Sequence, residues 1–341
     1  MNVSGMAKSL WAGWARDLPG RHSNLRAEYI PTGMTRDPLS PMLQPVRNLA
    51  AQNRFEEAVA LIERFRTNEI YSWSGRPLSN YAAHALTGDF VADTGHEAAN
   101  IARLEHIRAW QARAPHCPYA AAALADACAS TAHSIRGCEF ANKVTKEQWA
   151  GHAVYANMAH EALLAAYPLH KCHWYWARIY FGAALTTGEQ AGEHTLRFTA
   201  AFNAAPFDPS NYRTLAHALL PRWYGSFAMI EANAAWISDQ TQSRLGQAAY
   251  AMMYELVAEY DDLPSTDADW DRLHRGFTDW FAAFPSDRVR TAHASAAVEY
   301  DQLDIFRDVA ESADRIYEDQ WAAPLDFYTA NSLARTFTSD R

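Results

Sequence analysis

The chain has 341 residues, of which 49% are apolar and 20% are charged, and it contains 12 Trp, 16 Tyr and 15 Phe. This apolar and aromatic content is enough to form a buried core, and it excludes an intrinsically disordered chain. At this length we expect either two domains or one extended repeat array.

The net charge of −9 is distributed unevenly along the chain. Residues Glu255–Asp319 contain 17 acidic and 6 basic residues, a balance of −11, which leaves +2 for the remainder. A field of this sign repels nucleic acid and anionic membranes and favours a basic partner. The alternative interpretation is a solvated helical surface that keeps the protein in solution.

The sequence has no run near the ~18 apolar residues that a membrane span needs. Met1–Gly20 also lacks the apolar core of a signal peptide. The four cysteines show no Cys-x-x-Cys spacing and are too few to cross-link a chain of this size. We therefore predict a cytoplasmic protein with reduced thiols and no membrane partner.

Residues 1–45 are rich in proline, glycine and arginine and lack a sustained period, so we expect an irregular N-terminal arm or cap. From Val46 onwards, apolar residues recur at i, i+3, i+4 and i+7 on both sides of Gln52–Arg54, which predicts a helical hairpin. Residues 46–135 are therefore predicted to form helical hairpins. The further helices expected in this region lie at about 78–86, 98–114 and 119–133.

The best local signal is Val144–Trp149. Thr145 occupies an N-cap position and Gln148 the N3 position of a capping box, and Val144 and Trp149 form a hydrophobic staple. This pattern predicts a helix from about Lys146 to Tyr167 that ends before Pro168.

Residues 136–341 are predicted to form a helical repeat region, because each apolar segment is bounded by proline, glycine or a polar N-cap. Helix pairs begin roughly 35 to 43 residues apart, which is the spacing of two-helix solenoid repeats. No segment of this region shows a strand pattern that would argue against helices. The fold class predicted is all-α, a tetratricopeptide-like right-handed α-α solenoid of helical hairpins. Helices are expected at about 173–187, 190–205, 210–220, 227–239, 242–260, 268–284, 287–299, 302–318 and 325–337.

Residues Leu219–Ser226 read Leu-Leu-Pro-Arg-Trp-Tyr-Gly-Ser. This stretch resembles the Leu-Pro-Arg-Trp-Gly-Gly-Ser signature of a bacterial family of unknown function with a tetratricopeptide-like helical fold, except that Tyr224 replaces the first glycine. The resemblance covers residues 130–335 and implies a fold but no activity. Shorter elements resemble the same family in the same order: Arg136-Gly137, Val144–Trp149, Phe202–Pro209, Tyr250–Tyr254 and Gly276–Ser286.

Arg222, Trp223 and Tyr224 are predicted to bind a partner. A guanidinium beside an indole can stack on a ligand or bind a carboxylate. The structural alternative is that Trp223 fills the gap between successive repeats while Arg222 caps the carbonyl groups of the preceding helix.

Five more residues are predicted to contact the partner. Trp174, Trp176 and Tyr180 are expected to line a concave groove. Asp261 and Asp262 belong to the acidic stretch that would attract a basic protein.

A metal site is not predicted, although His170, Cys172 and His173 are all good zinc ligands. On a helix the two histidines would share a face while Cys172 points elsewhere, and no second ligand pair with closing spacing follows. We expect no metal and no cofactor.

Catalytic motifs such as Gly-x-Ser-x-Gly, a Walker loop or a dinucleotide fingerprint do not occur in the sequence. Titratable residues scattered on helices are usually solvated or paired, so we predict that the protein is not an enzyme. Two groupings are conceivable as catalytic sets: Asp126 with Cys128 and His133, and Glu189 with Glu193 and His194.

The predicted function is that of a non-enzymatic helical scaffold that binds a basic protein. A more specific form of this prediction is a cytoplasmic immunity or adaptor protein. One alternative is a helical enzyme or small-ligand binder with a pocket near Arg222 and Trp223, using His173 or His194. A second is a structural subunit whose proline-rich N-terminal arm wraps a neighbour.

Overall fold

The computed structural model describes residues 28–30, 40–72, 74–87, 97–137, 142–187, 191–223, 225–322 and 330–331. These residues form fourteen α-helices and only two short strands, so the predicted all-α, helical repeat-like fold is confirmed. The chain divides into two compact units. We call residues 37–225 the N-terminal unit, and residues 226–341 together with residues 1–36 the C-terminal unit.

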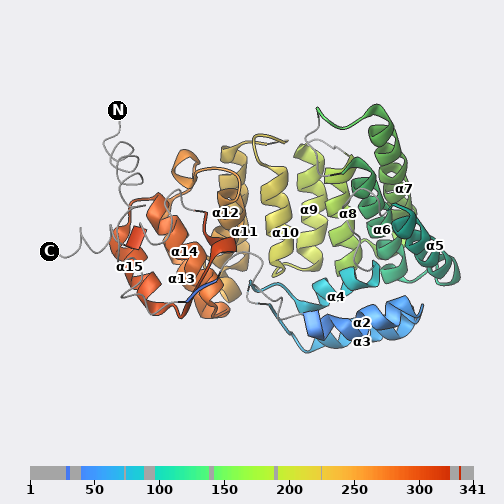
Figure 1. Ribbon diagram of the computed structural model, residues 1–341, viewed down its shortest axis with the longest axis horizontal. Helices are drawn as coiled ribbons and strands as arrows, with labels where there is room; N and C mark the ends of the chain where they lie inside the picture. Colours follow the sequence, from blue (N-terminus) through green and yellow to red (C-terminus); the bar gives the residue numbers. More distant parts are fainter. Residues whose placement is uncertain are drawn as a thin grey trace. The chain divides into compact units, whose positions relative to one another are not determined.

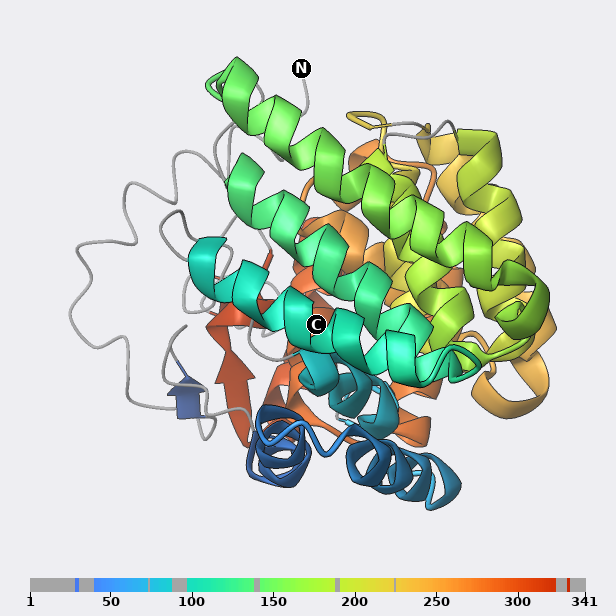
Figure 2. The same ribbon diagram turned by 90° about the vertical axis from the view of Figure 1, so that its right-hand side faces the viewer.

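The N-terminal unit is a two-layer helical array. Helices α4, α6, α8 and α10 contact one another in turn, and α5, α7 and α9 pack against them from outside. Figure 1 shows α8, α9 and α10 as neighbouring helices, and Figure 2 shows α5, α6 and α7 in a row. The helices are α2 (Ser40–Ala51), α3 (Phe55–Thr67), α4 (Leu78–Thr87), α5 (Glu97–Arg113), α6 (Pro118–Arg136), α7 (Lys146–His170), α8 (Trp174–Thr187), α9 (Ala191–Ala204) and α10 (Pro209–Ala218).

Alanine-rich sequences allow the inner helices to approach closely, because a methyl side chain adds little thickness. Seven alanines of α6 are buried, and most of α4 and α8 is buried as well. The predicted hairpin at residues 46–65 is confirmed as α2 and α3. Their connection is the short turn Gln52–Arg54.

The C-terminal unit is built around α12 and α14, whose residues are almost all buried. Each is flanked in sequence by more exposed helices that pack against it. The elements are β1 (Glu28–Ile30), α11 (Phe227–Leu245), α12 (Ala248–Ala258), η2 (Leu263–Ser265), α13 (Trp270–Ala283), α14 (Asp287–Glu299), α15 (Leu303–Ser312), β2 (Arg315–Tyr317) and η3 (Glu318–Gln320).

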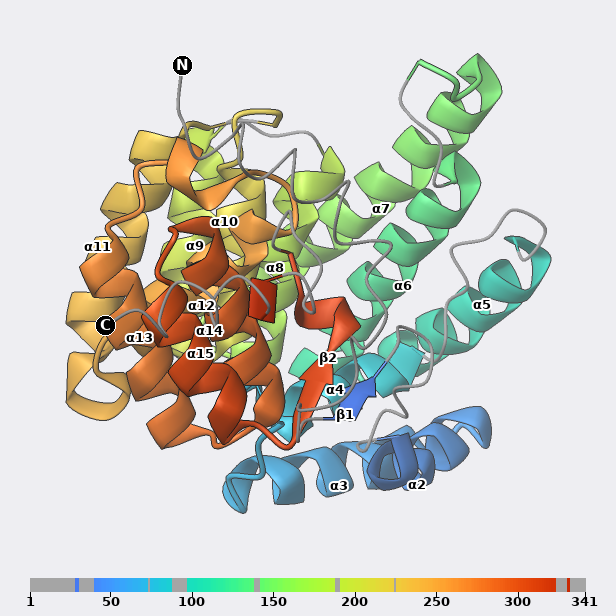
Figure 3. The ribbon, with the colours of Figure 1, turned by 60° about the vertical axis from the view of Figure 1, so that its left-hand side comes forward.

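Strands β1 and β2 correct the expectation that no strand would form. They pair in parallel, with Tyr29 opposite Ile316, and Figure 3 shows them side by side. Each strand has only three residues, which is too short to produce a recognisable alternation in the sequence. The pairing depends on a contact between segments nearly 300 residues apart.

Several helix ends also differ from the prediction. Helix α7 continues through Pro168 to His170, so the proline lies within its last turn rather than after its end. Helix α11 extends to Leu245 and ends at Gly246, whose φ of 54° suits a C-cap. Helix α15 ends at Ser312 because the chain then enters β2. The helix expected at 325–337 lies outside the described residues except for 330–331.

The capping box read from the sequence is confirmed. The Thr145 hydroxyl accepts a hydrogen bond from the Gln148 amide at 3.2 Å, and the Gln148 side chain accepts one from the Thr145 amide at 2.9 Å. Asp208, Ser226 and Ser286 also cap their helices through side-chain oxygens. None of the described helices has both the length and the hydropathy of a membrane-spanning segment.

Gly276 provides a test of the α12–α13 packing. A Cβ at this position would lie 2.8 Å from the Gln247 carbonyl oxygen and 2.9 Å from the Ala251 Cβ, so a Gly276→Ala variant must separate the helices. We expect it to lower the free energy of unfolding by about 1–2 kcal/mol, despite the higher helix propensity of alanine. Denaturant titration measures this loss.

Gly182 in α8 is the matched control, because a Cβ added there would meet no atom within 4 Å beyond the backbone of its own helix. Gly182→Ala should therefore raise the free energy of unfolding by up to ~1 kcal/mol. Equal effects of the two substitutions would contradict the close approach of α12 and α13.

Candidate functional site

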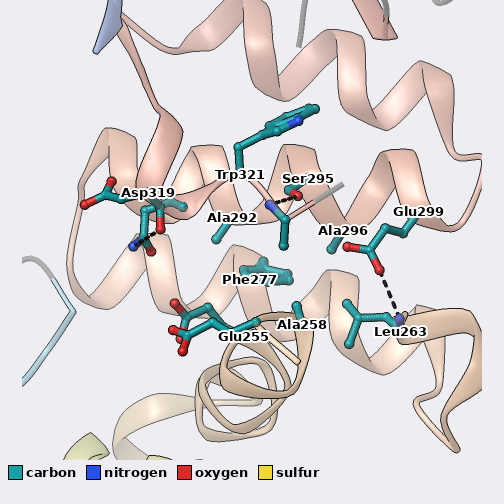
Figure 4. Close-up of a pocket in the computed structure, with 13 residues that line it drawn as sticks. Glu255, Ala258, Leu263, Phe277, Ala292, Ser295, Ala296, Glu299, Asp319 and Trp321 are labelled. Atoms are coloured by element: carbon teal, nitrogen blue, oxygen red, sulfur yellow. Dashed lines mark hydrogen bonds between the residues drawn. The ribbon is translucent and has the colours of Figure 1, made fainter. Parts of the chain in front are cut away.

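The C-terminal unit contains a cavity of about 320 Å³, which we call the acidic cavity. Helices α12, α13 and α14 line it together with η2, η3 and the two residues after η3. Its apolar wall includes Leu263, Phe277 and Trp321, and Figure 4 shows these side chains around the cavity. The carboxylates that line it are those of Glu255, Glu259, Glu299 and Asp319.

Glu255 and Glu299 are the two buried carboxylates of the cavity lining. Glu255 is the one charged residue within α12 and is only 8% exposed. Glu299, the last residue of α14, is 6% exposed, and its carboxylate accepts a hydrogen bond from the Leu263 amide at 2.9 Å. Removing a carboxylate from water costs several kcal/mol, so a buried acid at a cavity wall is the exception rather than the rule.

The opposite side of the cavity is formed by residues 319–322. Asp319 accepts a hydrogen bond from the Arg288 guanidinium at 2.7 Å. The Ala322 amide donates to the Ser295 hydroxyl at 2.9 Å, which holds this segment on α14 (Figure 4). The Trp321 ring packs edge-on against Phe306, with 6.1 Å between centroids. The η3 turn and the Trp321 side chain are therefore held in place by contacts within the C-terminal unit.

The acidic cavity brings four carboxylates together, and Arg288 pairs with one of them, Asp319, at its edge. All four acids belong to the stretch Glu255–Asp319 that the sequence singled out. An arrangement of acceptors beside aromatic surface can bind a cation by charge, hydrogen bonds and ring contact together.

Asp261 and Asp262, the acids chosen from the sequence, lie next to Leu263 at the entrance to η2. Asp262 is exposed, and Asp261 is partly buried. Neither Asp261 nor Asp262 lines the acidic cavity, and the sequence analysis did not single out Glu255 or Glu299. The signal for Glu255 was available, since a single acid within an apolar helix is unusual.

Trp174, Trp176 and Tyr180 do not form one surface. Trp176 stacks on Tyr180 with 4.9 Å between ring centroids, whereas Trp174 packs against Tyr119 and His173. Trp176 is fully buried, so a partner would reach this cluster through the partly exposed Tyr180.

Arg222 and Trp223 are exposed in the turn after α10, with Trp223 48% exposed and 5.6 Å from the His217 ring. Tyr224 lies outside the described residues. Gly225 is required by packing, because a Cβ there would collide with the Leu219 backbone. Neither Arg222 nor Trp223 lines the acidic cavity.

A second group of titratable side chains, the polar cluster, joins α4, α6 and α8 in the N-terminal unit. The His84 Nδ1 atom lies 3.0 Å from the Asp126 carboxylate, and His84 Nε2 contacts the Arg178 guanidinium. The Tyr175 hydroxyl donates to Asp126 at 3.4 Å. Burial, and then the nearby Arg178 charge, lowers the pKa of His84, so the ring is neutral at pH 7.

The catalytic grouping of Asp126 with Cys128 and His133 does not form. Asp126 pairs with His84 instead, and the His133 ring lies 3.1 Å from the Thr186 hydroxyl. Burial raises the pKa of the Cys128 thiol to about 12, which disfavours the nucleophilic thiolate. Glu189, from the other grouping, lies outside the described residues. Over the described ranges, the acidic and thiol side chains and the histidines form no group of three or more suited to a metal ion.

Comparison with known proteins finds a similarity over part of the chain. Residues 42–191, which span α3 to α8 and most of α2, match the family model described as a domain of unknown function, DUF4034. The matched range includes the polar cluster, but Leu219–Ser226 and the acidic cavity lie beyond it. No curated protein and no solved structure matches the chain.

His293 lies behind the cavity wall and makes stability depend on pH. Its ring stacks on Phe277 at 5.1 Å between centroids, and its Nε2 atom lies 2.9 Å from His274 Nδ1. Burial, and then the nearby His274, lowers the pKa of His293 to about 3. The unfolded chain therefore binds more protons than the folded chain between pH 3 and the ordinary histidine pKa of about 6.5.

We expect protonation of His293 to leave the free energy of unfolding unchanged above pH ~6.5. Below that pH it should lower the free energy of unfolding by about 1.4 kcal/mol per pH unit. His293→Phe, which keeps an aromatic ring against Phe277, should reduce this slope in denaturant titrations at pH 7.5, 6.5 and 5.5. His106→Gln, at an exposed position of α5, should leave the slope unchanged. A His293→Phe slope equal to that of the unmodified protein would contradict the assignment.

Proposed function

We propose that the protein is a non-enzymatic, tetratricopeptide-like helical scaffold of the cytoplasm that binds a basic protein. The observation that carries the proposal is the acidic cavity, where four carboxylates line a recess with aromatic walls. Helical arrays offer extended surfaces for protein partners and need no chemistry of their own.

Charge supports the same partner class at longer range. The excess of eleven negative charges in Glu255–Asp319 would accelerate encounter with a cationic protein and disfavour nucleic acid and anionic membranes. A basic toxin or effector is such a protein, and neutralising one would make this chain an immunity or adaptor protein. Arg222, Trp223 and Tyr180 remain predicted secondary contacts.

Affinity capture of the tagged protein from its native cells, at low and moderate salt, tests the proposal. We expect one stoichiometric basic protein, whose affinity for the unmodified chain falls as salt rises. A variant that neutralises four exposed acids outside the cavity should bind at least about tenfold more weakly at low salt, or ~1.4 kcal/mol, and show a weaker salt dependence. The four substitutions are Asp262→Asn, Asp267→Asn, Glu311→Gln and Asp314→Asn.

A control with the same change in net charge separates local from overall charge. It neutralises four exposed acids of the N-terminal unit, namely Glu56→Gln, Glu147→Gln, Glu161→Gln and Glu193→Gln. This control should retain binding. Capture of no basic protein, or equal losses in both variants, would refute the proposal.

A further inference from the structure

The polar cluster of the N-terminal unit contains a guanidinium whose charge no contacting group neutralises. Among the described residues, the one hydrogen bond of Arg178 goes to His84 Nε2. His84 Nδ1 lies 3.0 Å from Asp126, and the ring is neutral, so it offers Arg178 an acceptor without a charge. The Arg178 Nη1 atom is buried and has no hydrogen-bond partner. A buried donor without a partner costs free energy, so it points to a ligand that would accept from it.

Arg76 is a second arginine of this kind, in the turn before α4. Two hydrogen bonds to Ser72 hold this turn: the Arg76 carbonyl accepts from the Ser72 amide at 2.8 Å, and the Arg76 amide donates to the Ser72 hydroxyl at 3.2 Å. The Arg76 guanidinium lies over the Tyr81 ring, 4.4 Å from its centroid. Its Nε atom is buried without a partner, and no carboxylate in the described ranges forms an ion pair with it. We call Arg76 and Arg178 the arginine pair.

The two members of the arginine pair lie close enough to repel each other. Burial, and then the nearby Arg76 charge, lowers the pKa of Arg178 to about 10, although Asp208 and Asp126 act in the opposite direction. A lowered pKa means that the surroundings disfavour the charged form of this guanidinium. A bound anion would favour the charged form and offset the repulsion.

The nearby carboxylates are engaged by other groups. Asp126 accepts a hydrogen bond from His84 at 3.0 Å. Asp208 is the N-cap of α10, where it accepts from the Ser210 amide at 3.0 Å and from the Asn80 side chain at 2.6 Å. The positive end of the α10 dipole also favours its charge. The acceptors beside the arginine pair are therefore used within the fold, and the charges of the pair are left for another anion.

From these contacts we propose that the arginine pair binds a phosphate group, as free phosphate or as a phosphate monoester. Such a group carries about −1.5 to −2 charge at pH 7 and has several acceptor oxygens. The two guanidiniums come from separate segments, the turn before α4 and helix α8. They match a tetrahedral dianion better than a carboxylate, whose two oxygens lie in one plane and share one charge. The His84 side chain is 40% exposed, so solvent reaches the cluster.

Isothermal titration of the full-length chain in phosphate-free buffer at low salt tests the inference. The probes are inorganic phosphate, methyl phosphate and acetate. Inorganic phosphate should bind at least about tenfold more tightly than acetate, because it brings more charge and more acceptors. Methyl phosphate that binds with similar affinity would show that the site accepts a monoester, whereas binding of inorganic phosphate alone would assign the free anion.

Arg178→Gln and Arg76→Gln each remove one guanidinium and should weaken phosphate binding at least about tenfold. Arg64→Gln, an exposed change on α3 with the same change in net charge, is the control and should bind like the unmodified protein. In thermal melting, phosphate should raise the Tm of the unmodified protein and of the control more than that of the other two variants. Circular dichroism verifies folding, and Arg76→Gln decides the test if Arg178→Gln does not fold.

Three results would overturn the phosphate assignment: no measurable binding of phosphate, equal binding of phosphate and acetate, or full phosphate binding by a folded variant of the arginine pair. An equal loss in Arg64→Gln would overturn it as well, because binding would then respond only to overall charge. The inference is independent of the basic partner proposed above, since neither arginine lines the acidic cavity. Capture of a basic protein therefore neither supports nor contradicts it.

Discussion

Close packing of helices through small side chains is the constraint on which the rest of the structure depends. Alanines of α6 let the inner helices of the N-terminal unit meet, and Gly276 lets α13 approach α12 in the C-terminal unit. Larger residues at these points would separate the layers. The close approach of α13 also brings Phe277 to the cavity wall beside Glu255 of α12.

The two units differ in the surroundings of their buried carboxylates. In the polar cluster, Asp126 meets His84 and Tyr175, so its acceptor capacity is used within the N-terminal unit and ties three helices together. Such a network stabilises packing and leaves the His84 ring occupied on both nitrogens. The acids of the cavity instead line a recess, where Glu299 accepts a hydrogen bond from the Leu263 amide and Asp319 accepts one from Arg288.

These contrasting environments underlie the binding role proposed above. The His84 base is engaged by Arg178, and burial disfavours the Cys128 thiolate. The acidic cavity combines charge with ring surfaces, and those features support recognition of a cationic group.

The sequence by itself determined the helical class, most helix positions and their caps, because apolar period, proline position and N-cap chemistry act over only a few residues. It also located the acidic stretch, since charge is simply counted. Only the tertiary structure decided the β1–β2 pairing, the pairing of Asp126 with His84 and the meeting of Glu255, Glu299 and Asp319 around one cavity. Those contacts join residues tens to hundreds of positions apart, so they depend on how whole helices pack, which no local pattern encodes.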